Sequence, residues 1–391
     1  MSIGGSSAAA ELATIVPWAT PAPRITVAER QARIAKAQTL IDAAGASAIL
    51  IGAGASLRYY AGIPWGATER LVALLIPVHG TPIMICPRFE RGSLEAALEI
   101  DADLRLWEED QSPFVLVAGA VTGRLLLDPQ LPYCTATALA DAGVDVANGG
   151  AVVDACRSIK SDAEIALISQ AMAMTLEVHH RAARILRPGI AASDVIRFID
   201  AAHRAMGSSG SYFCAVQFGH ATAFPHGVPG DQHLADDQLV LIDTGCQVDG
   251  YHSDITRTYA FGAVGAEERA IWAIERAAQQ AAFDAARPGV TCEAIDAAAR
   301  GVLEKAGLGP DYRLPGLPHR TGHGIGLSIH EPAYLVRGDT TPLAPGMCFS
   351  NEPMIVVPDR FGIRLEDHFH VTDTGAAWFT EPQPSIDHPF G

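Results

Sequence analysis

Residues 239–262 have the sequence LVLIDTGCQVDGYHSDITRTYAFG, and this stretch decides the fold of the second half of the chain. Two apolar runs flank Asp249-Gly250, a dipeptide that favours the tight turn of a β-hairpin. Asp243 and Asp254 lie 11 positions apart, and the midpoint between them falls beside this turn. The stretch therefore predicts a hairpin that carries two facing carboxylates.

Residues 347–372 repeat this design. They have the sequence MCFSNEPMIVVPDRFGIRLEDHFHVT, with a turn expected near Pro358-Asp359. Glu352 and Glu366 lie 14 positions apart, and Asp359 stands midway between them. This stretch predicts a second hairpin with two acids.

The segments that precede the two hairpins repeat at an offset of 100 residues. Their ends are Pro188-Gly189 and Gly207 in the first copy, and Pro288-Gly289 and Gly307 in the second. Ser193 and Thr291 are residues of helix-capping type, and each stands before an Ala-rich helix. Chance similarity is the alternative for the helices alone. With the hairpins included, the pattern predicts two similar α+β halves around a pseudo-twofold axis.

The four acids lie on or beside apolar strands. A buried carboxylate costs solvation free energy unless a partner compensates it, and four neighbouring carboxylates raise one another's pKa. Two divalent cations would remove both penalties. A single acid of this kind is most simply a surface residue at a hairpin end, whereas four acids in matched hairpins favour a metal centre.

Three histidines are candidates for the same site. His323 stands among glycines in TGHGIG, which allows close backbone approach, and imidazole is a common ligand for transition metals. His226, in FPHG, lies 97 residues earlier, so we expect it to be the quasi-equivalent residue without a metal. His330 is too far from His323 for a helical ligand pair. We expect it to face the substrate, with a core histidine as the alternative.

The first half of the chain has an α/β pattern. Helices are expected at 27–44 and 135–142, and strands at 48–51, 71–76, 82–86 and 125–127, with 71–86 as a hairpin. A polar stretch at 155–162 precedes a long helix at 163–186. We therefore expect a loose arm at 1–24, an N-terminal domain at 25–158 and a catalytic domain at 159–391.

Composition limits the partners. The net charge of −16 disfavours nucleic acid and anionic membranes. No apolar run is long enough for a membrane span, and the first 23 residues lack the basic start of a signal peptide. Seven scattered cysteines without a Cys-x-x-Cys pair indicate a reducing compartment, so a cytoplasmic enzyme is expected.

These motifs resemble the pita-bread metallopeptidase family, and its prolidase and aminopeptidase P branch in particular. The matching strings are Asp243-Thr244-Gly245, residues 250–258 (GYHSDITRT), residues 322–326 (GHGIG) and residues 364–367 (RLED). Residues 58–62 (RYYAG) and 69–70 (ER) resemble a creatinase-like N-terminal domain more weakly. The resemblance implies an α+β pita-bread catalytic domain with an internal pseudo-twofold repeat, preceded by a smaller α/β creatinase-like domain.

The resemblance also implies the ligand set. Asp243 would chelate one divalent ion, Asp254 and Glu366 would bridge two ions, and His323 and Glu352 would complete the second site. Manganese is the expected metal, with cobalt, zinc or iron as alternatives. A homodimer is expected as well.

The implied chemistry is attack of a metal-bridging hydroxide on the carbonyl before proline. His226 and His330 would hold the substrate and the developing oxyanion, and Glu352 would move the proton to the leaving nitrogen.

The chain departs from the family pattern at two positions. Val356 stands where prolidases often carry a tyrosine, and Tyr334 stands where they carry a carboxylate-binding arginine. Arg337 is the nearest replacement for substrate binding, with Arg364 as a second candidate, and both have a structural role as the alternative.

The leading hypothesis is an Xaa-Pro dipeptidase. An aminopeptidase P acting on longer Xaa-Pro peptides is the close alternative, and a small-molecule lyase or amidinohydrolase on the same fold is a more distant one. A metal-free binding module is disfavoured because all five ligand residues are present.

Overall fold

The computed structural model describes residues 3–390, and these fall into two compact units. One unit consists of residues 24–157, and the other combines residues 3–23 with 158–390. The domain division expected from the sequence, 25–158 and 159–391, follows similar limits, and we keep it as a proposal. No helix within residues 3–390 has the length and apolar character needed to cross a membrane.

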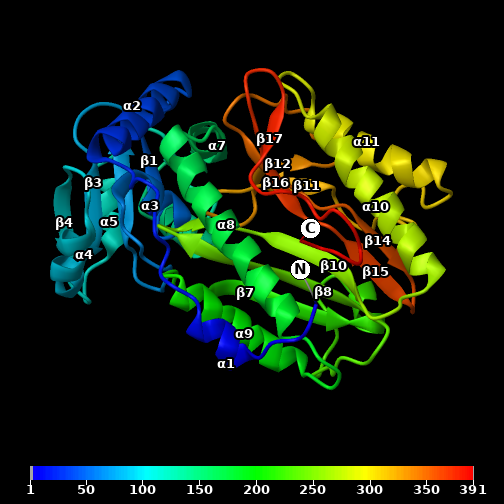
Figure 1. The fold of residues 1–391 in the computed structure, drawn as a ribbon. Helices are drawn as coiled ribbons and strands as arrows, with labels where there is room; N and C mark the ends of the chain where they lie inside the picture. Colours follow the sequence, from blue (N-terminus) through cyan, green and yellow to red (C-terminus); the bar gives the residue numbers. More distant parts are fainter. Residues whose placement is uncertain (1–2, 391) are drawn as a thin grey trace. The chain divides into compact units, whose positions relative to one another are not determined.

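The unit of residues 24–157 is built on one mixed sheet (Figure 1). Its strands are β1 (Ala48–Gly52), β2 (Ala73–Pro77), β3 (Ile83–Pro87), β4 (Asp103–Trp107), β5 (Leu125–Leu127) and β6 (Val146–Asn148). Its helices are α2 (Val27–Ala43), α3 (Ala55–Ala61), η1 (Arg88–Glu90), α4 (Arg91–Ala97), α5 (Pro113–Ala118), α6 (Tyr133–Asp141) and α7 (Gly150–Arg157). The strand order is β4-β3-β2-β1-β5-β6.

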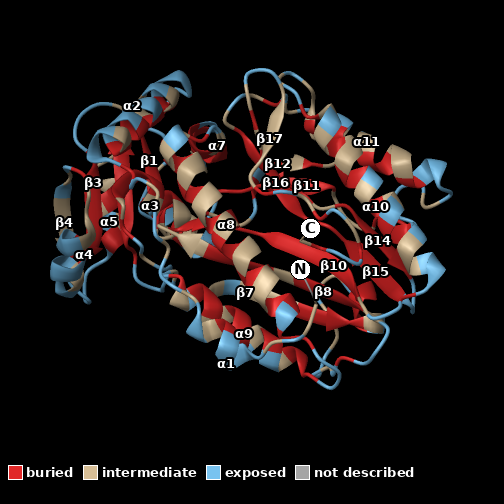
Figure 2. Ribbon diagram, in the orientation of Figure 1, coloured by how far each residue is buried: buried red, intermediate tan, exposed pale blue. Residues whose placement is uncertain are grey.

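Strand β1 lies inside this sheet and is buried throughout, as its continuous apolar sequence requires. The expected hairpin is confirmed, because β2 and β3 are antiparallel with Leu75 opposite Ile83. Strands β5 and β6 extend the sheet in parallel from β1. The strands β1, β2, β3 and β5 are the most buried part of the unit, whereas the edge strands β4 and β6 and the outer faces of the helices are more exposed (Figure 2).

The second unit contains three sheets and two pairs of long helices. Its strands are β7 (Ser211–Phe218), β8 (Gln238–Val248), β9 (Tyr251–His252), β10 (Ile255–Phe261), β11 (Gly322–Gly324), β12 (Glu331–Leu335), β13 (Cys348–Asn351), β14 (Met354–Val357), β15 (Phe361–Arg364), β16 (Asp367–Val371) and β17 (Ala376–Trp378). Its helices are α1 (Ala8–Ala13), α8 (Asp162–Arg184), α9 (Ala192–Ala205), η2 (Gly219–Ala223), α10 (Ala266–Ala285) and α11 (Cys292–Lys305). The sheets are β10-β8-β7 with β9 beside β8, β12-β11-β13-β16-β17, and β14-β15.

Each helix pair packs on the strands of its own half. Val195, Phe198 and Ile199 place the apolar face of α9 against β7 and β8, in the core between the first helix pair and its sheet. Ile295 and Leu303 give α11 the same kind of face in the second core.

Backbone hydrogen bonds confirm the internal repeat. Gly189 N–H donates to Leu234 C=O at 2.7 Å, and Gly289 N–H donates to Leu343 C=O at 2.8 Å. In return, Leu234 N–H donates to Ile190 C=O, and Leu343 N–H donates to Val290 C=O. The chain therefore enters the second helix of each half through the same local structure.

Two details differ from the sequence predictions. Helix α9 begins after Ala191 without a side-chain cap, while Ser193 lies in the first turn and donates to Asp231. Residues 3–23, expected to form a loose arm, instead contain α1. Glu11 of this helix is buried and pairs with Arg184 at 3.1 Å, and Ser7 caps the helix by accepting from Ala10 N–H.

Candidate metal centre

The first hairpin brings two of the predicted acids to one place. Asp243 lies on β8 opposite Thr256 of β10, and Asp254 lies between β9 and β10. Asp249 and Gly250 have φ values of 47° and 83°, which is the left-handed backbone that a tight hairpin turn requires. The turn predicted from this dipeptide is therefore confirmed.

The second pair of acids stands at the ends of two paired strands. Asn351 of β13 is opposite Asp367 of β16, so Glu352 and Glu366 lie just beyond that pair, on the same end of the ladder. Thr256 links Glu366 to the first hairpin: its carbonyl accepts from Glu366 N–H at 3.0 Å, and its hydroxyl donates to Glu366 Oε2 at 2.7 Å.

His323 is fixed from both sides. It lies on β11, its backbone N–H donates to Ser350 Oγ at 2.8 Å, and its Nδ1 donates to the carbonyl of Gly324 at 3.0 Å. This orientation turns Nε2 toward the acids, 3.1 Å from Glu352 Oε1 and 3.8 Å from Asp254 Oδ2. Ser350 also donates to Glu352 at 3.2 Å and so orients both side chains.

Burial and mutual repulsion dominate the electrostatics. Burial raises the pKa of Asp254 and of Glu366 well above the usual carboxyl values, and the neighbouring carboxylates, including Asp243, raise both further. Burial also raises the pKa of Asp243, although the charge of Arg364 opposes it. Burial would raise the pKa of Glu352 too, but the hydrogen bond and charge of His323 hold it below its usual range. Without a compensating cation, Asp243, Asp254 and Glu366 are therefore carboxyl groups that resist ionisation.

The unsatisfied oxygens fit a metal. Asp243 Oδ1, Asp254 Oδ1 and Glu366 Oε1 are all buried, and none has a hydrogen-bond partner within the described residues. A buried acceptor without a donor is costly, and carboxylate oxygens with one imidazole suit divalent ions such as manganese, cobalt, zinc and iron. The residues present therefore fit one or more divalent cations.

The two candidate arginines are in different settings. Arg364 is buried, forms an ion pair with Asp243, and donates from Nε to Thr256 Oγ1 at 3.0 Å. Its contacts are those of a residue that positions Asp243, so they favour the structural alternative to substrate binding. Arg337 is exposed and pairs with Asp311. Within residues 3–390 no hydrogen bond or ion pair joins it to the four acids, so the geometry gives its predicted role no support.

The predicted substrate-facing histidines lie at the edge of the cluster. The His330 ring is 4.2 Å from the His323 ring between centroids, and the residue keeps an exposed edge. Partial burial, followed by the charges of His323 and Arg320, lowers the pKa of His330 to about 4. His226 is exposed in the turn after η2, near enough to contribute to that lowering. Both positions are compatible with their predicted roles.

The residues that depart from the family pattern have ordinary packing roles. Val356 is buried in the core on β14, opposite Gly362. Tyr334 lies on β12 opposite His323, and the Arg320 guanidinium stacks 4.4 Å above its ring.

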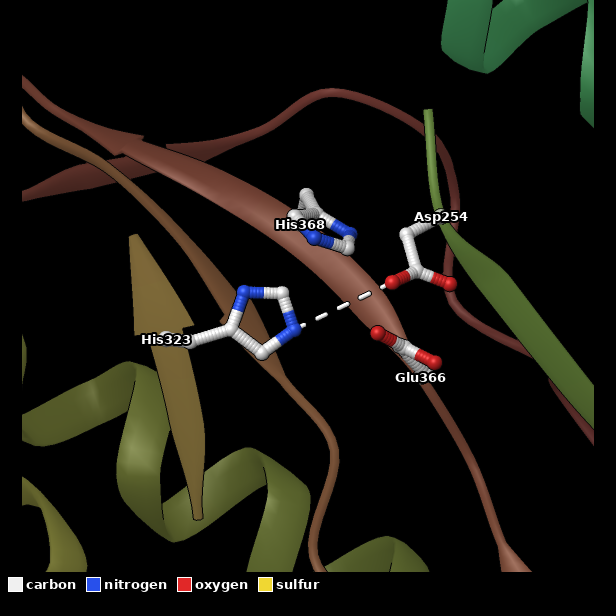
Figure 3. A group of neighbouring side chains, drawn as sticks. All are labelled: Asp254, His323, Glu366 and His368. Carbon is white, nitrogen blue, oxygen red and sulfur yellow. Dashed lines mark ion pairs between the residues drawn. The ribbon is translucent and has the colours of Figure 1, made fainter. Parts of the chain in front are cut away.

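One residue of the cluster was missed by the sequence analysis. His368, on β16, lies with Asp254, His323 and Glu366 so that one ligand atom from each is within 4.8 Å of the others (Figure 3). The available signal was its position two residues after Glu366 in an extended segment, where alternate side chains point to one face.

A two-layered α+β repeat that buries carboxylates and an imidazole at its centre defines a metal-dependent hydrolase. Residues 166–373 match Metallopeptidase family M24, and residues 33–159 match the Creatinase/Prolidase N-terminal domain. The chain therefore belongs to metallopeptidase family M24, and its fold is the pita-bread fold expected from the sequence.

Several known proteins are similar along most of their length. The probable dipeptidase PepE of Mycobacterium tuberculosis is 38% identical over 351 residues, which cover 88% of this chain and 92% of PepE. The crystal structure of dipeptidase PepE from Mycobacterium ulcerans superposes with a TM-score of 0.87 at 36% identity, covering 93% of this chain and 99% of that one. A prolidase from Thermococcus sibiricus gives a TM-score of 0.82 at 28% identity, covering 90% and 96%.

Proposed function

We propose that this chain is a dinuclear-metal peptidase that hydrolyses Xaa-Pro dipeptides. The observation that carries the proposal is the cluster of four acids around His323. Three of the acids each keep one buried oxygen that has no hydrogen-bond partner among the described residues. The similarity to a prolidase and to two proteins named dipeptidase supports the choice of substrate.

The proposed ligands are the five residues predicted from the sequence: Asp243, Asp254, His323, Glu352 and Glu366. When bound, two divalent ions would supply a Lewis acid for the scissile carbonyl and a water nucleophile that is acidic enough to act near neutral pH.

The surrounding residues would keep these ligands in place. Arg364 fixes Asp243 through its ion pair, Thr256 fixes Glu366, and Ser350 orients Glu352 together with His323. Glu352 is the proposed proton carrier to the leaving proline nitrogen, because its side chain lies beside His323 in the cluster and keeps part of its surface exposed. His226 and His330, at the exposed edge, are the proposed donors to the substrate.

A direct test is release of proline from Ala-Pro by protein supplied with Mn²⁺ or Co²⁺. We expect release that needs the metal and that falls to background in Glu366→Gln. Glu267→Gln is the matched control, because Glu267 is half exposed in a surface ion pair with Arg360, and it should retain full activity. Absence of proline release with every divalent ion tried would reject the proposal.

One observation favours aminopeptidase P activity as the second candidate. A dipeptide presents a free carboxylate beside proline, but Tyr334 replaces the expected arginine and Arg337 is engaged with Asp311. Comparing kcat/KM for Ala-Pro with that for Ala-Pro-Ala separates the two: preference for the dipeptide supports the first proposal, and preference for the tripeptide supports the second. The lyase or amidinohydrolase alternative would show as inactivity on both peptides.

The remaining proposals concern the cofactor, the assembly and the compartment. We propose manganese as the working metal, a homodimer, and a cytoplasmic location. The cysteines support a reducing compartment, because all seven are free and five are buried. Light scattering that gives the mass of a single chain at micromolar concentration would contradict the dimer.

A further inference from the structure

His368 is a buried histidine beside the residues proposed as metal ligands. The residue has no exposed surface, and neither of its ring nitrogens has a hydrogen-bond partner within the described residues. A neutral imidazole carries one donor and one acceptor, and leaving both unsatisfied in the interior costs free energy. Such a side chain is expected where a bound group that is not part of the polypeptide interacts with the ring nitrogens.

The other buried histidines among the described residues each have at least one hydrogen-bond partner within the protein, although Nδ1 of His179 has none. His179 binds the carbonyl of Ile255 at 3.0 Å, and His203 contacts Thr175 and Ser211 at 3.1 and 2.9 Å. His252 contacts the carbonyl of Gly326 at 3.1 Å. Burial alone therefore does not explain the state of His368.

The neighbours of His368 indicate what the partner is. Its ligand atom lies within 4.8 Å of atoms from Asp254, His323 and Glu366, and its ring centroid is 6.0 Å from that of His323. Figure 3 shows the His368 ring on β16 beside the ring of His323 and the carboxylates of Asp254 and Glu366. Asp254 and Glu366 each contribute an unsatisfied oxygen to the same space.

The backbone fixes this position. His368 is opposite Ser350 in the β13–β16 register, and Ser350 is the residue that orients His323 and Glu352. The ring also lies near the backbone carbonyl of Asp254, at a geometry short of a hydrogen bond. One nitrogen can therefore turn toward that carbonyl while the other remains available to a cation.

We propose that His368 is a further ligand of the divalent ion held by Asp254, His323 and Glu366. This inference rests on the proposed metal centre and adds a second imidazole to its five expected ligands. Imidazole suits cobalt and zinc better than manganese, whereas carboxylates suit manganese well. The centre should therefore bind Co²⁺ and Zn²⁺ more tightly, relative to Mn²⁺, than the same centre without His368.

The test compares wild type with His368→Gln, and His370→Gln serves as the control. His370 lies on the same strand, but its ring packs 5.2 Å from that of Phe379 and is outside the cluster. Metal-free proteins are titrated with Co²⁺, Zn²⁺ and Mn²⁺ by calorimetry, and the visible spectrum of the Co²⁺ form is recorded. For His368→Gln we expect at least about tenfold weaker binding of Co²⁺ and Zn²⁺, a smaller loss for Mn²⁺, and an altered spectrum.

Unchanged affinities and an unchanged Co²⁺ spectrum in His368→Gln would overturn the inference and leave the peptidase proposal intact. A wild-type chain that binds no divalent ion would overturn both. If His368→Gln does not fold, X-ray absorption on the Co²⁺-loaded wild type decides instead. Two imidazoles for each pair of ions support the inference, and one imidazole overturns it.

Discussion

At the proposed metal centre, some residues are placed to bind the cation and others hold these residues in position. Arg364 holds one oxygen of Asp243, and Thr256 holds one oxygen of Glu366. The other oxygen of each carboxylate has no hydrogen-bond partner within residues 3–390. This arrangement fixes the carboxylates before a cation arrives, so less conformational entropy is lost on binding. Removing the cation should leave the repulsion among the acids uncompensated.

The clustering of the four acids could be predicted from the sequence because they occur in two matched stretches at fixed distances from a turn. The role of Arg364 could not, since the sequence did not reveal that its guanidinium would meet Asp243 rather than substrate. His368 was missed because its meaning depends on the pairing of β16 with β13, a contact between segments that local patterns do not define.

The buried His203 gives a prediction for the pH dependence of stability. Burial lowers its pKa to about 4 in the folded chain, against about 6.5 for an ordinary histidine. Between these values the unfolded chain binds a proton that the folded chain does not, so the free energy of unfolding falls as the pH drops below about 6.5. The loss from pH 7 to pH 5 is about 2 kcal/mol for this group.

Urea unfolding at pH 7 and pH 5, at fixed metal content, measures this effect. His203→Gln should lose less stability on acidification than wild type, whereas His388→Gln, which alters an exposed residue near the C-terminus, should behave as wild type does. Equal losses in wild type and His203→Gln would contradict the assignment.

At the scale of elements, β11 packs closely against its two neighbouring strands. It lies between β12 and β13, and a Cβ added at Gly322 would clash with the backbone oxygen of Ser350. A Cβ at Gly324 would clash with the backbone oxygen of Glu331. Strand packing therefore requires the glycines on both sides of His323. This is a more specific reason than the close backbone approach that the sequence indicated.

Gly322→Ala should consequently destabilise the chain by about 2–3 kcal/mol and weaken metal binding, because β11 must move and carry His323 with it. Gly301→Ala is the control, since Gly301 lies within α11 with open space around its Cα and should gain about 0.5–1 kcal/mol. Thermal unfolding and calorimetric titration with Mn²⁺ measure both. A Gly322→Ala variant as stable as wild type would be inconsistent with this packing.

Helix and strand periodicity predicted α2, α6 and the strands β1, β2, β3 and β5 of residues 24–157, with β5 at its observed limits. It missed β4, β6 and the remaining helices of this unit. The stretch 347–372 was simplified to one hairpin. In the structure β14 and β15 form a separate two-stranded sheet, while β13 and β16 belong to the five-stranded one. The alternation of side chains along a strand does not tell which sheet the strand joins. Pro353 separates β13 from β14, but the sequence is apolar on both sides of it, so the change of sheet leaves no signal.

At the scale of the second unit, the repeat explains why acids more than 100 residues apart meet. Each half contributes one hairpin, and β10 contacts the β15–β16 region through the bridge between Thr256 and Glu366. Arg257 and Asp367 stabilise this junction with a fully buried ion pair at 2.6 Å. The two residues directly follow Thr256 and Glu366, which are joined by a hydrogen bond. The repeat was visible in the sequence, whereas this junction was not, because it is made by residues with no spacing pattern of their own.

We propose that a pair of divalent ions binds beside this junction, and the metal content of the protein tests this binding most directly. Metal-free chain is titrated with Mn²⁺ and with Co²⁺, dialysed, and its ions are counted by elemental analysis. The prediction is two ions per chain for wild type and a clear loss in a variant combining Asp254→Asn with Glu366→Gln. Failure of wild type to retain any ion, or two ions retained by the double variant, would contradict it.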